Sequence, residues 1–187
     1  MSQDSLLIRN CQGLEEMRAC VALQKEVWNF ADIDLVPLRM FVVGEKIGGQ
    51  VIGAFDQGEL VGFAFAIPGL RHGHSFLHSQ MLAVRHQYRN CGLGRRLKLF
   101  QREDALARGV ELMEWTFDPL EIKNAYLNIE KLGAIVRRYQ TNLYGVTSSV
   151  LQGGLPTDRL VAEWWLKSKR VETLLASGVK PSFQALA

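Results

Sequence analysis

A basic run between Arg89 and Lys98 reads RNCGLGRRLK and is the part of the chain best suited to hold a ligand. Leu93, Leu97 and Phe100 follow one another at helical spacing, so a helix begins inside this run. A helix N-terminus already presents the positive end of a dipole and N–H groups without partners, and arginine is unfavourable there. A bound polyphosphate would neutralise the arginines and the dipole together.

This stretch can be compared with several known types of ligand-binding loop. Gly92 and Gly94 would let the backbone approach an anion closely, and the helix that follows would direct N–H groups at it. The dinucleotide fingerprint G-x-G-x-x-G is incomplete, because Leu97 stands where the third glycine belongs, and G-K-[ST] does not occur. A solvated turn is the alternative to an anion-binding loop. The loop's cationic residues favour anion binding, and they are Arg85, Arg89, Arg95, Arg96 and Lys98.

The composition describes one globular domain over residues 1–187, with a core at about 6–166 and an extension at 167–187. The chain has 187 residues, of which 48% are hydrophobic and 22% charged, and a net charge of +3. Because the positive charge is concentrated in one loop, we expect no nucleic acid partner. No apolar run reaches about 18 residues, so no membrane contact is expected.

Cysteine usage favours a reducing compartment. Cys11, Cys20 and Cys91 are odd in number and form no C-x-x-C motif, so we expect no disulfide framework and a cytoplasmic location.

Hydrophobic periodicity predicts a mixed order of strands and helices. Strands are predicted at Leu6–Arg9, on both sides of Asp56-Gln57-Gly58-Glu59 as a hairpin, at Ser75–Val84, at Leu112–Phe117, and in AIVRRYQTNLYG and RLVAEWWL. Helices are predicted at Leu14–Phe30, at Leu93–Arg108 with Gly109 as its cap, and at Glu121–Leu132. The last of these has an apolar stripe of Ile122, Ala125, Tyr126, Ile129 and Leu132.

The segment MLAVRHQYRNCGLGRRL resembles motif A of the GNAT superfamily, the GCN5-related N-acyltransferases. In that family [RQ]-x-x-G-x-[GA] follows the fourth strand, and here these positions are Arg89, Gly92 and Gly94. The resemblance continues through a strand, a helix and the exit Leu132-Gly133-Ala134. It covers roughly Ser75 to Gly145 well.

The resemblance implies an α/β fold, with a central, splayed, mostly antiparallel sheet flanked by helices. It also implies that acetyl-CoA or another acyl-CoA lies in a V-shaped gap between the fourth and fifth strands. The strand backbone would pair with the pantetheine arm, and the loop would hold the pyrophosphate. These cofactor-binding residues are Leu82, Ala83, Val84, Arg89, Asn90, Cys91, Gly92, Leu93, Gly94 and Arg95.

The family's reaction implies a base for the acceptor ammonium and an acid for the departing thiolate. Many members carry a carboxylate on the fourth strand, but here those positions hold Gln80 and Met81. His78 lies on the same strand face as Gln80 and is the candidate base, with a half-exposed structural histidine as the alternative. The family's acidic tyrosine position holds Ile129, so Tyr126, one turn earlier, is the candidate acid, with a core aromatic as the alternative.

Further polar residues lie where the family contacts its ligands. Asn124 is a candidate for CoA and Asn128 for the substrate, although both could face water. Asp118 could hold the acceptor amine or cap the next helix. Beside His72 and His74 no cysteine or carboxylate completes a ligand set, so no metal is expected.

Two functions follow from these residues. The first is a cytoplasmic acyl-CoA-dependent N-acyltransferase that moves an acetyl or succinyl group to the primary amine of a small metabolite such as an amino acid, with a homodimer possible. The second is a non-catalytic acyl-CoA-binding or regulatory module, which the missing carboxylate and the displaced tyrosine motivate.

Overall fold

The structure is a computed structural model that describes residues 6–145 and 156–177. Its N-terminal half contains β1 (Leu7–Asn10), α1 (Gly13–Trp28), the 3-10 turn η2 (Asp32–Asp34), α2 (Leu38–Lys46), β2 (Gln50–Asp56), β3 (Glu59–Arg71), β4 (His74–Val84), the 3-10 turn η3 (His86–Tyr88) and α3 (Leu93–Ala107). The remainder contains β5 (Leu112–Phe117), α4 (Ile122–Ala125), the π-helical η4 (Tyr126–Lys131), β6 (Ile135–Gln140), β7 (Arg159–Trp165) and α5 (Lys169–Ser177).

The strands form one sheet in the order β1-β2-β3-β4-β5-β7-β6, with helices on both faces. All neighbouring strands are antiparallel except β4 and β5. The predicted mixed fold with a mostly antiparallel sheet is therefore confirmed. Within the described residues, no helix has the length and apolarity to cross a membrane.

The predicted hairpin joins β2 to β3 through Gln57 and Gly58, which have φ angles of 49° and 89°. Two consecutive positive φ angles match the twist of antiparallel strands, and glycine supplies one of them without strain. His72 and Gly73 repeat the pattern between β3 and β4, with φ angles of 51° and 79°. These two turns place β2, β3 and β4 side by side.

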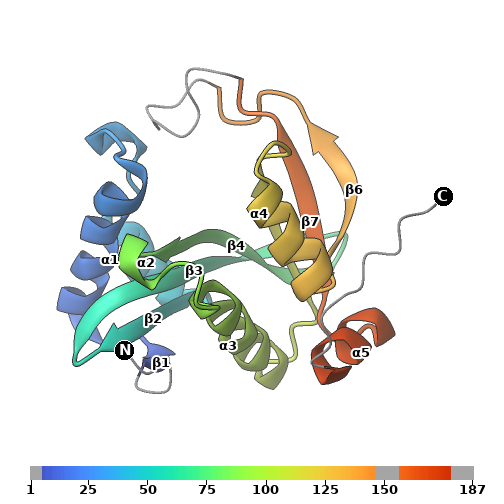
Figure 1. Cartoon of the computed structure of the whole chain (residues 1–187), viewed down its shortest axis with the longest axis horizontal. Helices are drawn as coiled ribbons and strands as arrows, with labels where there is room; N and C mark the ends of the chain where they lie inside the picture. Colours follow the sequence, from blue (N-terminus) through green and yellow to red (C-terminus); the bar gives the residue numbers. More distant parts are fainter. Residues whose placement is uncertain (1–5, 146–155, 178–187) are drawn as a thin grey trace.

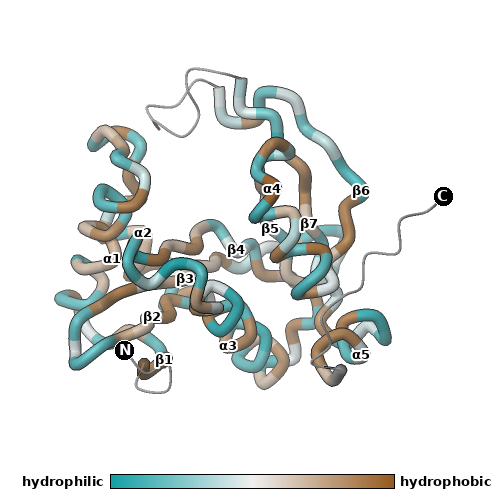
Figure 2. Tube along the Cα trace, in the orientation of Figure 1, coloured by the Kyte–Doolittle hydropathy of each residue, from teal (hydrophilic) through white to brown (hydrophobic). Residues whose placement is uncertain are grey.

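Two layers of side chains cover β2, β3 and β4. On one face Phe63 and Phe65 pack with Phe41 of α2 and with α1, and on the other Ala64 packs with Leu93 and Leu97 of α3. A third cluster, around the perpendicular pair Trp115 and Trp164, lies under β5 and β7. Figure 2 shows the hydrophobic residues following the central strands.

The fourth and fifth strands diverge after a very short parallel contact. Only Leu77 pairs with Met113 and His78 with Glu114, after which β4 and β5 continue without pairing each other. In Figure 1, α1 lies on the left, and α4, β6 and β7 lie on the right of this division. We call the place where the two strands part, just after His78 and Glu114, the strand junction.

The helix predicted at Glu121–Leu132 differs from expectation. One α-helical turn gives way at Tyr126 to a π-helix, in which the Leu132 N–H bonds the Leu127 carbonyl. The wider turn shifts the buried face, so Asn128 is buried while Ile122 is 81% exposed. The predicted apolar stripe is therefore wrong at its N-terminal end.

Candidate functional site

The loop between β4 and α3 has the backbone geometry of an anion site. Asn90 and Gly92 have φ angles of 62° and 81°, and Gly92 begins α3 without a side-chain cap. Within the described residues, the backbone N–H groups from Asn90 to Arg95 have no hydrogen-bond partner, and the first helical bond runs from Arg96 to the Gly92 carbonyl. Six consecutive free donors at a helix start suit an anion.

The side chains of this basic stretch are less alike than the sequence suggested. Arg85 turns away from the loop and pairs with Glu26 and Glu59. Arg89 donates to the Val84 carbonyl at 3.0 Å, and Lys98 is buried. The five cations therefore do not form one cluster, and the backbone is the larger part of the anion site.

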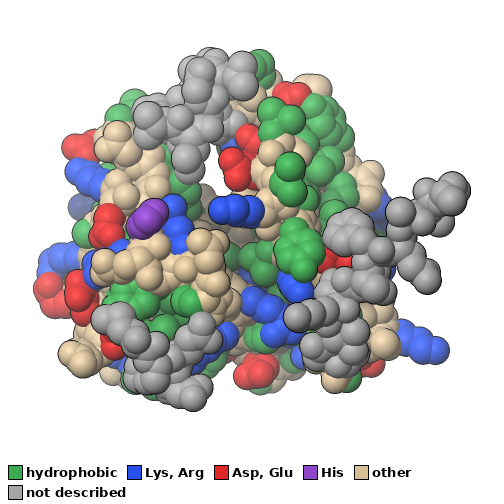
Figure 3. Space-filling view, in the orientation of Figure 1, with side chains coloured by type: hydrophobic (Ala, Val, Ile, Leu, Met, Phe, Trp, Pro, Cys, Tyr) green, Lys and Arg blue, Asp and Glu red, His purple; other side chains and the backbone are tan. Residues whose placement is uncertain are grey.

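The edge of β4 beside the loop is open on the side of the gap. Leu82 pairs with Ala64, Ala83 with Phe63 and Val84 with Gly62, all on β3, and none of the three pairs with β5. An unpaired edge offers N–H and C=O groups to an extended ligand, and of these the Val84 carbonyl already accepts from Arg89. Figure 3 shows the surface hollowed between the two halves, with Lys and Arg side chains in and around the hollow.

A β-bulge lies in β4 at the strand junction. Ser79 pairs with Ala66 and Met81 with Phe65, so Gln80 is an extra residue. Bulges occur often beside active sites, where they redirect side chains. The bulge leaves Ser79 on the face covered by α3 and His78 on the opposite one.

His78 is half-buried, and its imidazole has no hydrogen-bond partner among the described residues. Burial is the main reason that its pKa lies below the ordinary value, and the charge of Glu114 partly opposes this effect. The imidazole is therefore neutral at neutral pH and has a free nitrogen lone pair. That state allows it to accept a proton.

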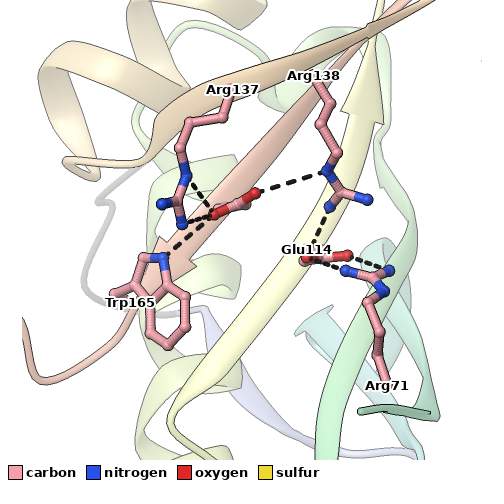
Figure 4. A network of polar contacts seen from close by, with 6 residues as sticks. Arg71, Glu114, Arg137, Arg138 and Trp165 are labelled. Carbon is pink, nitrogen blue, oxygen red and sulfur yellow. Dashed lines mark hydrogen bonds and ion pairs between the residues drawn. The ribbon is translucent and has the colours of Figure 1, made fainter. Parts of the chain in front are cut away.

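Beside His78, Glu114 is the centre of an arginine network shown in Figure 4. It accepts two hydrogen bonds from Arg71, at 2.7 and 2.9 Å, and one from Arg138 at 2.8 Å. Burial alone would raise the pKa of Glu114, but these hydrogen bonds outweigh it and lower the pKa below the ordinary value. Glu114 is thus an ionised, occupied carboxylate and does not replace the family's base.

The residues predicted on the helix after β5 lie in different environments. Tyr126 is 40% exposed with the Lys131 ammonium over its ring, so its interpretation as a core aromatic is wrong. Asn124 is exposed, whereas Asn128 is buried, and the amide of Asn128 has no hydrogen-bond partner among the described residues. Their i,i+4 spacing would put both on one face of a regular α-helix, but Asn128 lies in the π-helix and the two differ in burial.

Asp118 closes the turn after β5. Its carboxylate accepts a hydrogen bond from the Leu120 N–H at 2.8 Å and lies 3.5 Å from Arg159. The N-cap of α4 is Glu121, so Asp118 does not cap that helix directly. As for metals, the described residues contain no group of three or more His, Cys, Asp or Glu side chains able to hold an ion.

Sequence reasoning missed the polar group under the strand junction. Lys98 is only 2% exposed, and its ammonium donates to the Ser79 hydroxyl at 2.7 Å and lies 3.8 Å from the centre of the Trp115 ring. Burial lowers the pKa of Lys98 to about 7. Lys98 directly follows Leu97 at an inward helical position, and that spacing could have revealed it.

Comparison with known proteins agrees with this geometry. The model of the acetyltransferase (GNAT) family matches residues 14–128, and the chain therefore belongs to the GNAT family. No curated protein matches the chain.

Several solved structures share the fold. A GNAT acetyltransferase from Streptococcus pneumoniae is 19% identical, with a TM-score of 0.66 over 84% of this chain and 98% of its own. A GNAT acetyltransferase from Elizabethkingia anophelis with acetyl-CoA bound is 15% identical, with a TM-score of 0.65 over 87% and 99%. The ribosomal-protein-S18-alanine N-acetyltransferase from Escherichia coli is 17% identical, with a TM-score of 0.65 over 87% and 95%.

Proposed function

We propose that the protein is an acyl-CoA-dependent N-acyltransferase that moves an acetyl or succinyl group to the primary amine of a small metabolite, with an amino acid as the preferred acceptor. The observation that carries the proposal is the open edge of β4 ending in a loop with six free N–H groups. The phosphates of CoA would occupy the loop, and the pantetheine arm would pair with Leu82–Val84.

His78 is the proposed base. The acceptor amine would approach on the sheet face that carries His78, and the imidazole would take its proton during attack on the thioester. The lowered pKa of His78 supports this role, because the group is unprotonated at neutral pH. Asn128 is buried with an amide free to meet a ligand, whereas exposed Asn124 would contact only the outer part of CoA.

The acceptor is the least constrained part of the proposal. The Escherichia coli relative acts on a ribosomal protein, as its name states. The preference for a small acceptor comes from the resemblance to GNAT enzymes that act on amino acids, and not from Arg71 and Arg138, because these are already paired with Glu114.

The loop is tested by comparing two variants for CoA binding. Gly94→Asp would place a carboxylate next to the free N–H groups, whereas Arg96→Ala removes a side chain that bonds the Leu6 carbonyl. We expect Gly94→Asp to weaken CoA binding far more than Arg96→Ala, as measured by titration calorimetry. Equal affinities would contradict the assignment of the loop.

Turnover is tested by release of free CoA over a panel of amines with acetyl-CoA and succinyl-CoA. His78→Gln should lower kcat by about 10²–10³-fold, within the range of general acid–base groups, and leave CoA affinity unchanged. An unchanged rate would transfer the role of base to water. CoA binding without turnover on any acceptor would favour the non-catalytic module.

A further inference from the structure

The buried Lys98 lies directly at the strand junction. Its two nearest partners are Ser79 and Trp115, which are the residues that follow the last paired positions of β4 and β5. The ammonium therefore bridges the two strands where they part, on the face covered by α3.

Lys98 has no carboxylate partner. It forms no ion pair with any residue that the structure describes, although burying an unpaired cation is unfavourable. The Ser79 hydroxyl and the Trp115 ring compensate part of this penalty. The ammonium of Lys98 would therefore be stabilised by negative charge that a bound ligand brings or that forms during a reaction.

Negative charge would form here if CoA binds as proposed. The pantetheine arm would run from the loop back along β4, from Val84 toward Ser79. These five steps of strand span about 17 Å at 3.3 Å per residue. The sulfur end of the arm would then lie at the strand junction, where the C–S bond breaks and the sulfur takes its electrons.

The helix after β5 offers no buried acid for that sulfur. The family's tyrosine position holds Ile129, and the nearby Tyr126 is 40% exposed with its ring under Lys131. Lys98 approaches the junction from α3, and its ammonium is a buried, cationic proton donor there.

We propose that the Lys98 ammonium is the general acid of this enzyme and gives its proton to the departing CoA thiolate. The inference rests on the proposed acyltransferase function. The acceptor nitrogen bonds to the thioester carbon and loses a proton to His78. The C–S bond breaks, an N–H bond of Lys98 breaks, and an S–H bond forms. After CoA leaves, His78 releases its proton to water and Lys98 regains one from water, which restores both groups.

The groups that surround Lys98 are compatible with its role as a proton donor. The Ser79 hydroxyl on β4, the Trp115 ring on β5 and the Gln101 amide on α3 surround the Lys98–Ser79 pair, and Ser79 donates onward to Gln101 at 3.0 Å. The titratable neighbour is His78, whose pKa is lowered mainly by burial; the charge of Glu114 raises it, and the charges of Lys98 and Arg71 lower it further. With a pKa of about 7, Lys98 can release its proton near neutrality.

The test compares Lys98→Met, Lys98→Arg and the exposed control Lys46→Met. Methionine keeps an unbranched side chain but has no acidic proton to donate. Arginine keeps the positive charge but does not release its proton at neutral pH. We expect both Lys98 variants to lower kcat by at least about 10²-fold with little change in the KM for acyl-CoA. The control should match the wild type.

The pH profile of kcat supplies the readout that loss of packing would not give. Wild-type kcat should rise as His78 deprotonates and fall as Lys98 deprotonates above about pH 7. His78→Gln should remove only the acidic limb, and Lys98→Met only the basic limb.

Three outcomes would overturn the role of Lys98: a folded Lys98→Met with wild-type kcat, a Lys98→Arg with full activity, or a wild-type profile without a basic limb. The last needs no variant and applies even if Lys98→Met does not fold. Absence of wild-type turnover with any donor or acceptor would instead overturn the acyltransferase proposal itself, and the role of Lys98 with it.

Discussion

Two buried charges lie on opposite faces of the sheet at the strand junction, and their surroundings differ. Glu114, 3% exposed, is held by Arg71 and Arg138, whereas Lys98, 2% exposed, contacts a hydroxyl and an aromatic ring and has no carboxylate partner in the described part of the chain. A neutralised charge stabilises the fold and stays ionised. A charge without a counterion lowers stability and changes its protonation state readily, as a group in proton transfer must.

The largest expected effect comes from removing the counterions of Glu114. The double variant Arg71→Met/Arg138→Met leaves a buried carboxylate unpaired and should lower the free energy of unfolding by about 3–5 kcal/mol at pH 7. In the wild type the lowered pKa of Glu114 stabilises the fold above about pH 4.3, and this contribution is lost as the pH falls below that value. In the variant the carboxylate is destabilising until it is protonated.

Urea denaturation at pH 7 and pH 4 checks this expectation, because the difference between variant and wild type should shrink at pH 4. A difference of the same size at both pH values would show that lost packing, rather than charge, is responsible.

For Lys98 we expect a substitution to raise the free energy of unfolding instead of lowering it. Replacing a buried unpaired cation with an apolar side chain of similar shape should stabilise the fold, so Lys98→Met should raise the free energy of unfolding at pH 6 by about 1–4 kcal/mol. The pKa of Lys98 is about 7 in the folded protein and about 10.4 in the unfolded chain, which therefore binds more protons between these values. Wild-type stability thus rises with pH across this window.

The advantage of Lys98→Met should accordingly narrow between pH 7 and pH 10, as measured by denaturation at pH 6 and pH 9.5. If Lys98→Met were less stable than the wild type at pH 6, Glu114 and Lys98 would not differ in their effect on stability as expected.

The smallest effect is expected at the outer end of the arginine network. Arg137 pairs with Glu163, but its side chain is 59% exposed, and Glu163 also accepts from Trp165 and lies 3.6 Å from Arg138. Arg137→Met should therefore change the free energy of unfolding by less than about 1 kcal/mol. A loss above about 2 kcal/mol in the same denaturation assay would mean that Glu163 and Glu114 share their counterions as one unit.

Local patterns predicted most of the fold. The two apolar runs that flank Asp56-Gln57-Gly58-Glu59 predicted the hairpin, and Gly109, with φ of 76°, follows α3 as expected. The segment LVPLRMFVVGEKIGG contains α2. Most predicted boundaries lie within two residues of the observed ones, as at α1, expected to end at Phe30 and ending at Trp28. The extension expected at 167–187 contains α5, and residues 178–187 lie outside the described residues.

The site was less predictable because it depends on contacts between distant segments. The glycine loop could be recognised from its own sequence, since its free N–H groups follow from local φ angles. Arg85 could not be separated from the loop, because Glu26 and Glu59, which pair with it, are far away in the chain. No local sequence pattern identifies the π-helix at Tyr126 either. In the structure Tyr126, predicted on the apolar stripe, is exposed, and Asn128, which could have faced water, is buried.

The strand junction also separates two consecutive parts of the chain. The segments from β1 to α3 precede Gly109, and those from β5 to α5 follow it. Besides the two residue pairs of the sheet, the halves are joined by contacts such as those of Arg102 with the Leu166 carbonyl. A single cut near Gly109 should therefore yield two fragments that reassemble when coexpressed. A different C-terminal fragment could then give the same anion-binding loop a new acceptor surface.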